Sequence, residues 1–273
     1  MKIGIIACSD GLKNSETQTG KYRELISFLE SCNLEIERAA TIFRKENHIY
    51  SGKPQERAGW LNRLFADREI SYIFDLSGGD SGNEILEYLD YDIIKNSKAV
   101  YCGYSDLSTV INAIYTKSGK KSYYYNIWNL LSEKNGEEQK NWFKEIFIEG
   151  KYRRENLKIE YGSRIEGDVL GGNLRCFSKV IGTEYMPDFT GKNILIEAWS
   201  GDEARFRTYL YQMKQAGIFK KVKGVILGTF TELEKEKSSE YIYNMAKEIT
   251  EVENIVKLGN IGHNSDSYTM LIG

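Results

Sequence analysis

The sequence predicts an α/β fold built on a parallel sheet that helices cover on both faces. Short apolar runs alternate with amphipathic segments along the chain. Lys2–Ala7 is such a run and is expected to be a buried strand, while Gly20–Ser31 repeats its apolar residues at the spacing of a helix. Apolar strands that alternate with helices are typical of parallel sheets, since both faces of each strand are then buried.

The first half of the chain continues this alternation. We expect further strands at Leu34–Arg38, Tyr72–Leu76 and Ala99–Cys102, and helices at Gln55–Asp67, Glu84–Leu89, Tyr91–Lys95 and Leu107–Tyr115. Pro54 stands where a helix can begin, because the first helical position needs no backbone N–H donor.

The second half shows the same alternation after a polar, charged segment, Glu149–Glu155. We place the domain boundary there and predict an N-terminal domain over residues 1–152 and a C-terminal domain over residues 153–273. A helix at Gln139–Ile148 precedes the boundary. After it we expect strands at Leu157–Tyr161, Arg164–Leu170, Asn193–Ile196, Val222–Leu227 and, as the last strand, Asn254–Leu258. We expect one helix from the end of Gly171–Leu174 to about Ile181, and two more at Ala204–Ala216 and Ser238–Thr250.

The composition is typical of a soluble globular protein. The chain has 273 residues, of which 41% are hydrophobic and 28% charged, and its net charge of −2 is spread over interspersed acids and bases. This balance favours neither nucleic acid nor an anionic membrane as a partner. No apolar run approaches transmembrane length, and the run at the N-terminus is too short for the core of a signal peptide.

Four scattered cysteines and two histidines limit the chemistry. Cys8, Cys32, Cys102 and Cys176 lack CxxC spacing, so we expect free thiols in a reducing compartment and hence a cytoplasmic protein. Two histidines cannot build a His-rich metal site, and we expect neither a metal nor another cofactor. His48 lies in a polar loop and is expected to be solvated.

The stretch Lys98–Leu107 contains a candidate nucleophile. Its apolar run ends at Gly103, and Ser105 follows just before a helix-patterned segment. A sharp turn between strand and helix places a side chain at the carboxyl edge of the sheet, beside helix-start N–H groups that stabilise an anion. Ser105 therefore has the position of a serine nucleophile, although a serine there can also serve only as the N-cap of the helix.

His263 and Glu197 are candidates for the general base and for the acid that orients it. His263 follows a glycine in a polar loop, where an imidazole can be aimed at a reacting group, although a lone loop histidine is more often a surface residue. Glu197 stands at the carboxyl end of an apolar strand, where burial would require a partner such as histidine. Its side chain can equally point into solvent at the end of the strand.

A serine hydrolase also needs N–H donors for the tetrahedral oxyanion. The N–H of Asp106, the residue after the candidate nucleophile, is one candidate, and the Gly78–Gly79 pair after a predicted strand supplies the other. The glycine pair can also be no more than a turn that ends the strand.

Several short motifs, in order over nearly the whole chain, resemble one family of serine peptidases. They are Ser77–Asp80 with Leu89–Lys95, Lys98–Asp106, Gly171–Leu174, Gly182–Thr183 with Met186–Asp188, Ile194–Glu197, Gln215–Phe219 with Gly224–Gly228, and Gly262–His263. The family includes the LD-carboxypeptidases of murein recycling (muramoyltetrapeptide carboxypeptidases) and the microcin C immunity peptidases. No single motif is decisive, but together they are highly specific.

The resemblance implies roles for the matching residues. Ser105 would be the nucleophile, His263 the general base and acid, and Glu197 the residue that orients the histidine. The N–H groups of Gly79 and Asp106 would form the oxyanion hole. The resemblance also implies a homodimer, a Rossmann-like N-terminal sheet domain and a smaller C-terminal α/β domain, with the active site in the cleft between the domains. The implied activity is hydrolysis of an amide bond through an acyl-enzyme.

The chain departs from the family pattern at four places. Ser77 precedes the glycine pair where many members have arginine, the usual Gly-Pro is missing near Tyr125–Ile127, and Cys8 and Leu271 stand where proline is common. Because the triad positions are intact, these departures concern the substrate more than the reaction. Ser77 and the Leu-Asp-Tyr-Asp run Leu89–Asp92 tilt the resemblance toward the microcin-immunity branch.

Two substrate classes stay open. One is a murein tetrapeptide, in which hydrolysis of the L,D-peptide bond releases D-alanine. The other is a peptidyl nucleotide, in which the amide or acyl-phosphoramide is cleaved. The sequence identifies no basic pocket for a peptide carboxylate. The aromatic residues of Tyr123–Trp128 would suit either pocket but are more often part of a core.

Two other functions share part of this pattern. An α/β-hydrolase esterase has the same order of serine, acid and histidine, but it requires Gly-x-Ser-x-Gly, and residue 107 is leucine. A non-catalytic ligand-binding protein on a two-domain scaffold is the second. A separation of more than about 10 Å between Ser105 and His263, with no hinge to close it, would favour that function over an enzyme.

Overall fold

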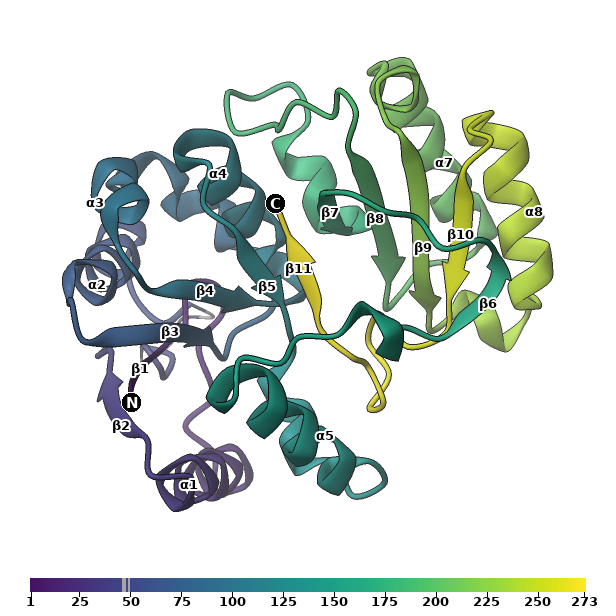
Figure 1. Ribbon diagram of the computed structural model, residues 1–273. Coiled ribbons are helices and arrows are strands. Elements are labelled where there is room, and N and C mark those ends of the chain that lie inside the picture. The colour runs from purple at the N-terminus through teal and green to yellow at the C-terminus, as the bar shows by residue number, and fades with distance from the viewer. Residues whose placement is uncertain (46–47, 49) are drawn as a thin grey trace.

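Two β-sheets lie side by side and contain all the strands of the described chain (Figure 1). The computed structural model describes residues 1–45, 48 and 50–273. The first sheet has the order β11-β5-β4-β3-β1-β2, with β1 at Lys2–Ile6, β2 at Glu35–Arg38, β3 at Ile70–Asp75, β4 at Val100–Gly103, β5 at Ser122–Tyr124 and β11 at Met270–Ile272. The second has the order β6-β10-β9-β8-β7, with β6 at Ile159–Gly162, β7 at Val169–Asn173, β8 at Asn193–Ala198, β9 at Gly224–Phe230 and β10 at Ile255–Leu258.

Helices cover both faces of the first sheet. In Figure 1, α2, α3 and α4 lie on one side of it and α1 and α5 on the other. Their bounds are α1 Glu16–Ser31, α2 Pro54–Ala66, α3 Tyr91–Asn96, α4 Ser108–Ser118 and α5 Gly136–Phe143. Strands β1 to β5 run parallel, and their apolar residues, such as Ile5 and Ile73, are fully buried. Helix α2 begins at Pro54, as the sequence predicts.

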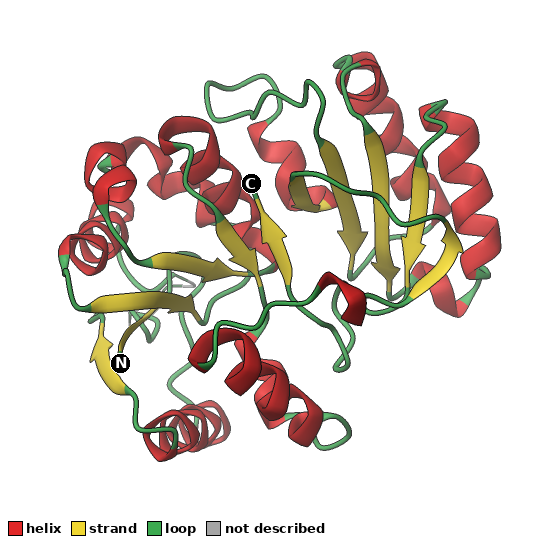
Figure 2. Ribbon diagram, viewed as in Figure 1, coloured by secondary structure: helices red, strands yellow, loops and turns green. Residues whose placement is uncertain are grey.

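The second sheet is smaller and has its own helices. Strands β7 to β10 are parallel, and β6 adds an antiparallel edge. The helices are α6 Leu174–Phe177, α7 Glu203–Gln215 and α8 Ser239–Thr250, and α7 and α8 lie against the outer face in Figure 2. Gly217, at a φ of +76°, follows the end of α7 in the left-handed conformation that commonly ends a helix and that glycine adopts easily. The predicted α/β class, with mostly parallel sheets in two domains, is confirmed.

The prediction that Asn254–Leu258 is the last strand is wrong. The short strand β11 follows it and pairs antiparallel with β5, placing Leu271 opposite Tyr123. A strand of three residues shows too little periodicity to be found in a sequence. Because β10 belongs to the second sheet and β11 to the first, the loop 259–269 crosses from one sheet to the other, and His263 lies in that loop.

Three expected helices differ in form from the prediction. Glu84–Leu89 is a 3₁₀-helix over Gly82–Tyr88. The helix expected at Gln139–Ile148 begins earlier, at Gly136, because acidic side chains in the first turn of α5 are favourable at a helix N-terminus. Its last residues, Lys144–Ile148, form a short π-helix. The helix after Gly171–Leu174 is divided into α6 and a 3₁₀ turn at Ser178–Val180.

Two further observations concern the described residues as a whole. None of their helices is both long and apolar enough to cross a membrane. The four cysteines have free thiol groups, and three of them, Cys8, Cys102 and Cys176, are buried.

Candidate active site

Ser105 lies in the turn between β4 and α4, and its backbone is strained. The strand ends at Gly103, and Ser105 has a φ of +56°, a left-handed conformation that is rare for a residue with a side chain. A Cβ at Gly103 would come within 2.8 Å of the Tyr101 ring and 2.9 Å of Leu107 Cβ, so the tight turn depends on glycine. A strained strand-to-helix turn is the local structure that exposes a serine nucleophile at the end of a sheet.

His263 is placed against this turn by the loop between the two sheets. Its Nε2 atom lies 3.1 Å from Ser105 Oγ, which is hydrogen-bond distance. The imidazole ring packs 4.5 Å from the Tyr104 ring, measured between centroids, and the Tyr104 hydroxyl donates to the Gly262 carbonyl oxygen at 2.9 Å. These contacts fix the ring beside the serine, and only 12% of the histidine side chain is exposed.

Glu197, near the end of β8, is fully buried rather than directed into solvent. Its Oε2 atom lies 2.7 Å from His263 Nδ1. Its Oε1 atom accepts the hydroxyl of Tyr124 at 2.6 Å and the side-chain amide of Asn173 at 2.9 Å. A buried carboxylate needs such donors, since burial removes its water. The glutamate is thereby fixed as an acceptor facing the histidine.

Tyr124 and Asn173 were not identified as site residues in the sequence. Burial, reinforced by the nearby carboxylate of Glu197, raises the pKa of Tyr124 well above its ordinary value, so its hydroxyl keeps the proton that it donates. Asn173 also caps α6 by accepting the Cys176 N–H. Its place in the Gly171–Leu174 motif was the available signal, whereas Tyr124 was concealed in a stretch of aromatic residues.

The Gly78–Gly79 loop follows β3 and lies beside the same turn. Gly79 has a φ of +123°, and a Cβ there would overlap the carboxyl group of Asp10. The Gly78 carbonyl accepts the N–H of Asp10 at 3.1 Å. Within the described part of the chain, neither the Gly79 N–H nor the Asp106 N–H donates to a protein acceptor. Both N–H groups are therefore unpaired within the described residues; Gly79 lines the cavity described below, and Asp106, next to Ser105 in the chain, is fully buried.

A cavity of about 490 Å³ opens next to these residues. Ser105, His263 and Gly79 are part of its wall. The rest of its lining includes three aromatic side chains and two basic ones, namely Tyr104, Trp128, Trp199, Lys21 and Arg44. Of the aromatic stretch at Tyr123–Trp128, only Asn126 and Trp128 reach the cavity, whereas Tyr124 and Tyr125 are buried in the core.

The basic side chains of the cavity could not be found in the sequence. Lys21 is an exposed residue of α1, and Arg44 lies in the loop after β2, where its Nε donates to the Gly11 carbonyl at 2.8 Å. They are far from the candidate triad along the chain and belong to no recognisable motif.

Among the described residues, no group of three or more His, Cys, Asp or Glu side chains is arranged to hold a metal ion. His48 is exposed, as expected.

Comparison with known proteins identifies relatives over most of the chain. Residues 3–125 match the model of the LD-carboxypeptidase N-terminal domain, and residues 166–273 match that of the LD-carboxypeptidase C-terminal domain. The microcin C7 self-immunity protein MccF of Escherichia coli is 30% identical over 217 residues, which cover 67% of this chain and 63% of that protein. A probable murein peptide carboxypeptidase of Bacillus subtilis is 25% identical over 238 residues, which cover 84% of this chain and 72% of that protein.

The fold is also shared with solved structures. The muramoyltetrapeptide carboxypeptidase of Oxalobacter formigenes superposes with a TM-score of 0.84 at 20% identity, over 100% of this chain and 93% of that one. The match to the Escherichia coli MccF sequence spans less than two thirds of that protein, 63% of its length.

Proposed function

We propose that this chain, which belongs to the LD-carboxypeptidase family, is a serine hydrolase that cleaves an amide bond through an acyl-enzyme. The observation that carries the proposal is the unbroken line of contacts from Ser105 through His263 to Glu197 at the wall of the cavity. Acyl transfer by a serine requires this arrangement of nucleophile, base and orienting acid.

The contacts support a role for each group. His263 takes the Ser105 proton at Nε2 while Oγ attacks the substrate carbonyl carbon, and it then donates that proton to the leaving amine. Glu197 holds the tautomer with a proton on Nδ1 and stabilises the imidazolium that forms. The N–H groups of Gly79 and Asp106 stabilise the oxyanion. Water, deprotonated by His263, then attacks the acyl group and frees Ser105.

For the substrate we propose a murein peptide from which a terminal D-amino acid is released. Such a peptide carries a free carboxylate next to the bond that is cleaved. Lys21 and Arg44 line the cavity that holds Ser105; Arg44 faces the Asp10 carboxylate at 3.6 Å, whereas Lys21 forms no ion pair with a described residue and can bind a substrate carboxylate. The carboxypeptidase relatives support the same substrate class.

An alternative substrate is the amide of a peptidyl or aminoacyl nucleotide, as in microcin C immunity. Trp199 lines the cavity with 60% of its surface exposed, and its ring lies 6.4 Å from that of His263 at an interplanar angle of 23°. An exposed indole beside a catalytic centre is suited to stack on a planar base. MccF itself has been solved in complex with glutamyl sulfamoyl guanosine.

A non-catalytic ligand-binding protein is the more remote alternative. The 3.1 Å separation between Ser105 Oγ and His263 Nε2 is far below the distance of about 10 Å that would favour it. A protein that only binds a ligand has no need of a strained backbone at a serine, whereas Ser105 adopts a left-handed conformation.

Mass spectrometry of the purified protein distinguishes these functions. The protein is incubated with a murein tetrapeptide and with a peptidyl-adenylate amide, and Ser105→Ala is the control. Loss of terminal D-alanine with the wild type alone supports the carboxypeptidase. Cleavage of the nucleotide conjugate alone supports the immunity function. Absence of cleavage, together with no covalent labelling of Ser105 by a fluorophosphonate, would exclude the serine hydrolase.

Two further properties complete the proposal. We expect a homodimer, as the family resemblance implies, and light scattering of the purified protein would measure its mass in solution. We also expect the protein in the cytoplasm, where its four free cysteines would stay reduced. Cell fractionation would test that location.

A further inference from the structure

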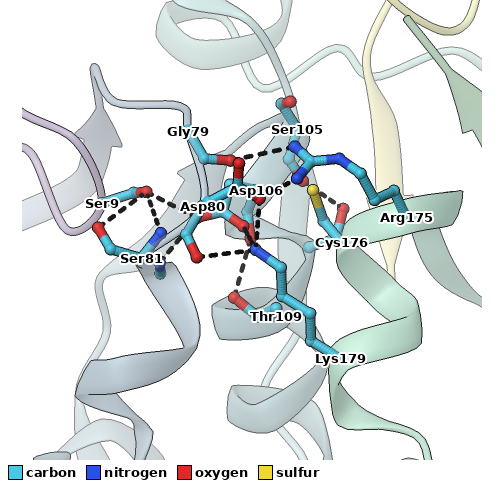
Figure 3. Close-up of polar contacts among 12 residues, drawn as sticks. Ser9, Gly79, Asp80, Ser81, Ser105, Asp106, Thr109, Arg175, Cys176 and Lys179 are labelled. Carbon is cyan, nitrogen blue, oxygen red and sulfur yellow. Dashed lines mark hydrogen bonds and ion pairs between the residues drawn. The ribbon is translucent and has the colours of Figure 1, made fainter. Parts of the chain in front are cut away.

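Two cations on one short segment, residues 173–179, contact the loops that carry the proposed oxyanion donors (Figure 3). Arg175 belongs to α6 and Lys179 to the 3₁₀ turn that follows it. Residues four apart lie on the same side of a helical segment, so both side chains extend in one direction. The segment comes from the second sheet, whereas the loops that it contacts follow strands of the first.

Lys179 joins the two loops directly. Its Nζ atom donates to Asp106 Oδ1 at 2.6 Å, to the Asp80 carbonyl oxygen at 2.9 Å and to Asp80 Oδ1 at 3.1 Å. An ammonium group has three N–H donors, and each of them has an acceptor here. The lysine thereby links the residue after Gly79 to the residue after Ser105.

The Asp106 carboxylate is fully buried and depends on these partners. Its Oδ2 atom accepts the hydroxyl of Ser9 at 2.6 Å and the N–H of Gly82 at 2.7 Å. Lys179 is its ion-pair partner within the described residues. An unpaired buried carboxylate would be costly, and here its negative charge would also lie next to the site where the oxyanion forms.

Three successive carbonyl groups of the glycine loop are each held by a donor from outside the loop. The Gly78 oxygen accepts the Asp10 N–H at 3.1 Å, the Gly79 oxygen accepts Nη2 of Arg175 at 3.2 Å, and the Asp80 oxygen accepts Nζ of Lys179. Because a peptide group is planar and trans, holding the Gly78 oxygen directs the Gly79 N–H to the opposite side. Rotation of the neighbouring peptide groups would have to break the bonds to Arg175 and Lys179.

We propose that Lys179 and Arg175 are positioning residues that fix the Gly79 loop relative to the turn at Asp106. They keep the two N–H groups directed at a common point, and Lys179 also neutralises the carboxylate beside it. Fixed donors cost no reorganisation when charge develops, which is the source of their catalytic effect. The inference rests on the proposed serine hydrolase and on its oxyanion donors.

The test is the rate at which a fluorophosphonate labels Ser105, because this reaction needs no knowledge of the natural substrate. Oγ forms a bond to phosphorus, fluoride leaves, and His263 takes the hydroxyl proton, while the phosphoryl oxygen occupies the oxyanion position. We expect Lys179→Met to lower the labelling rate constant by about 10- to 100-fold. Lys179→Arg should recover most of the rate, since it keeps the cation.

Two further variants separate positioning from folding. Lys117→Met removes another ion pair, from α4 to Glu184, that also joins the first half of the chain to the second, and this variant should label at the wild-type rate. The double variant D106N/K179M leaves no buried charge unpaired, so it should regain thermal stability and still label slowly. If Ser105 of D106N/K179M is labelled at the wild-type rate, the positioning role is wrong, while the proposed serine hydrolase stands. Absence of labelling of the wild type would overturn the proposed nucleophile, and the inference with it.

Discussion

The hydroxyl group of Tyr124 lies 2.6 Å from Oε1 of Glu197 and accepts the backbone N–H of Ser105 at 3.2 Å. One buried tyrosine thus joins the strained serine backbone to the carboxylate that faces His263. Since the pKa of Tyr124 is raised well above its ordinary value, chiefly by burial, the hydroxyl acts as a donor to Glu197 at any pH near neutrality. The tyrosine therefore belongs to the support of the proposed triad.

We predict that Tyr124→Phe lowers kcat by about tenfold and leaves KM nearly unchanged, because Glu197 loses one of two donors to Oε1 and the Ser105 N–H loses its acceptor. Steady-state kinetics on whichever substrate is cleaved would measure the change. Tyr125→Phe is the matched control, since no described group hydrogen-bonds to the Tyr125 hydroxyl. Equal kcat values for the two variants would contradict the role given to Tyr124.

Removal of the candidate nucleophile or base should have a far larger effect. Ser105→Ala and His263→Ala are each expected to lower kcat by about 10⁴-fold or more, and the double variant should be no slower than the slower single one, because triad members act as a unit. Multiplicative effects in the double variant would show that the two residues act independently.

The glycine loop allows a test with an internal control. A Cβ at Gly79 would overlap the Asp10 carboxyl group, and the φ of +123° is unfavourable for alanine, whereas a Cβ at Gly78 would meet nothing within 4 Å. Gly79→Ala should displace one of the two proposed oxyanion donors and lower kcat by about 100-fold, while Gly78→Ala should remain close to the wild type. A similar loss in both variants would mean that the loop needs flexibility rather than a fixed Gly79 N–H.

The sequence predicts part of this site well, for physical reasons. Ser105 follows a strand that ends in glycine, and Glu197 closes an apolar strand, so both are expected at a sheet edge. His263 could be selected because the chain has one other histidine, His48. The structure brings the three within contact distance, although 158 residues separate Ser105 from His263.

Other parts of the site could not be derived from local patterns. Lys179 and Asp106 are 73 residues apart, and neither the lysine nor its neighbours follow a motif that predicts their pairing. Lys21 reaches the cavity only because α1 packs beside the loops of the first sheet. The three residues of β11 show no periodicity, yet they return the chain to the first sheet and so determine the path of the loop that carries His263.

Lys21 should affect substrate binding rather than chemistry. It lines the cavity and forms no ion pair with another described residue, so its charge is available to a substrate carboxylate. We predict that Lys21→Gln raises KM for a murein tetrapeptide by about 10-fold, the equivalent of about 1.4 kcal/mol, with kcat unchanged. Arg23→Gln, on the same helix but outside the cavity lining, is the control. A fall in kcat with constant KM would place Lys21 in the chemical step instead.

Buried tyrosines should make the folded protein sensitive to alkaline pH. Burial raises the pKa of three of them well above the ordinary value, namely Tyr101, Tyr124 and Tyr125. The unfolded chain releases these protons near pH 10, whereas the folded chain retains them. Above that pH the unfolded state binds fewer protons, so the free energy of unfolding falls as pH rises, by about 1.4 kcal/mol per pH unit for each tyrosine.

Tyr125→Phe isolates one of these contributions. Because the Tyr125 hydroxyl is buried without a described partner, its removal should leave stability at pH 7 unchanged or raise it by about 1–3 kcal/mol. Between about pH 10 and 11 the variant should lose less stability than the wild type, by about 1 kcal/mol, because the unfolded tyrosine goes from half to mostly ionised over that range. Urea denaturation at each pH would measure both values. Parallel pH profiles for the two proteins would mean that Tyr125 ionises as readily in the folded state as in the unfolded chain.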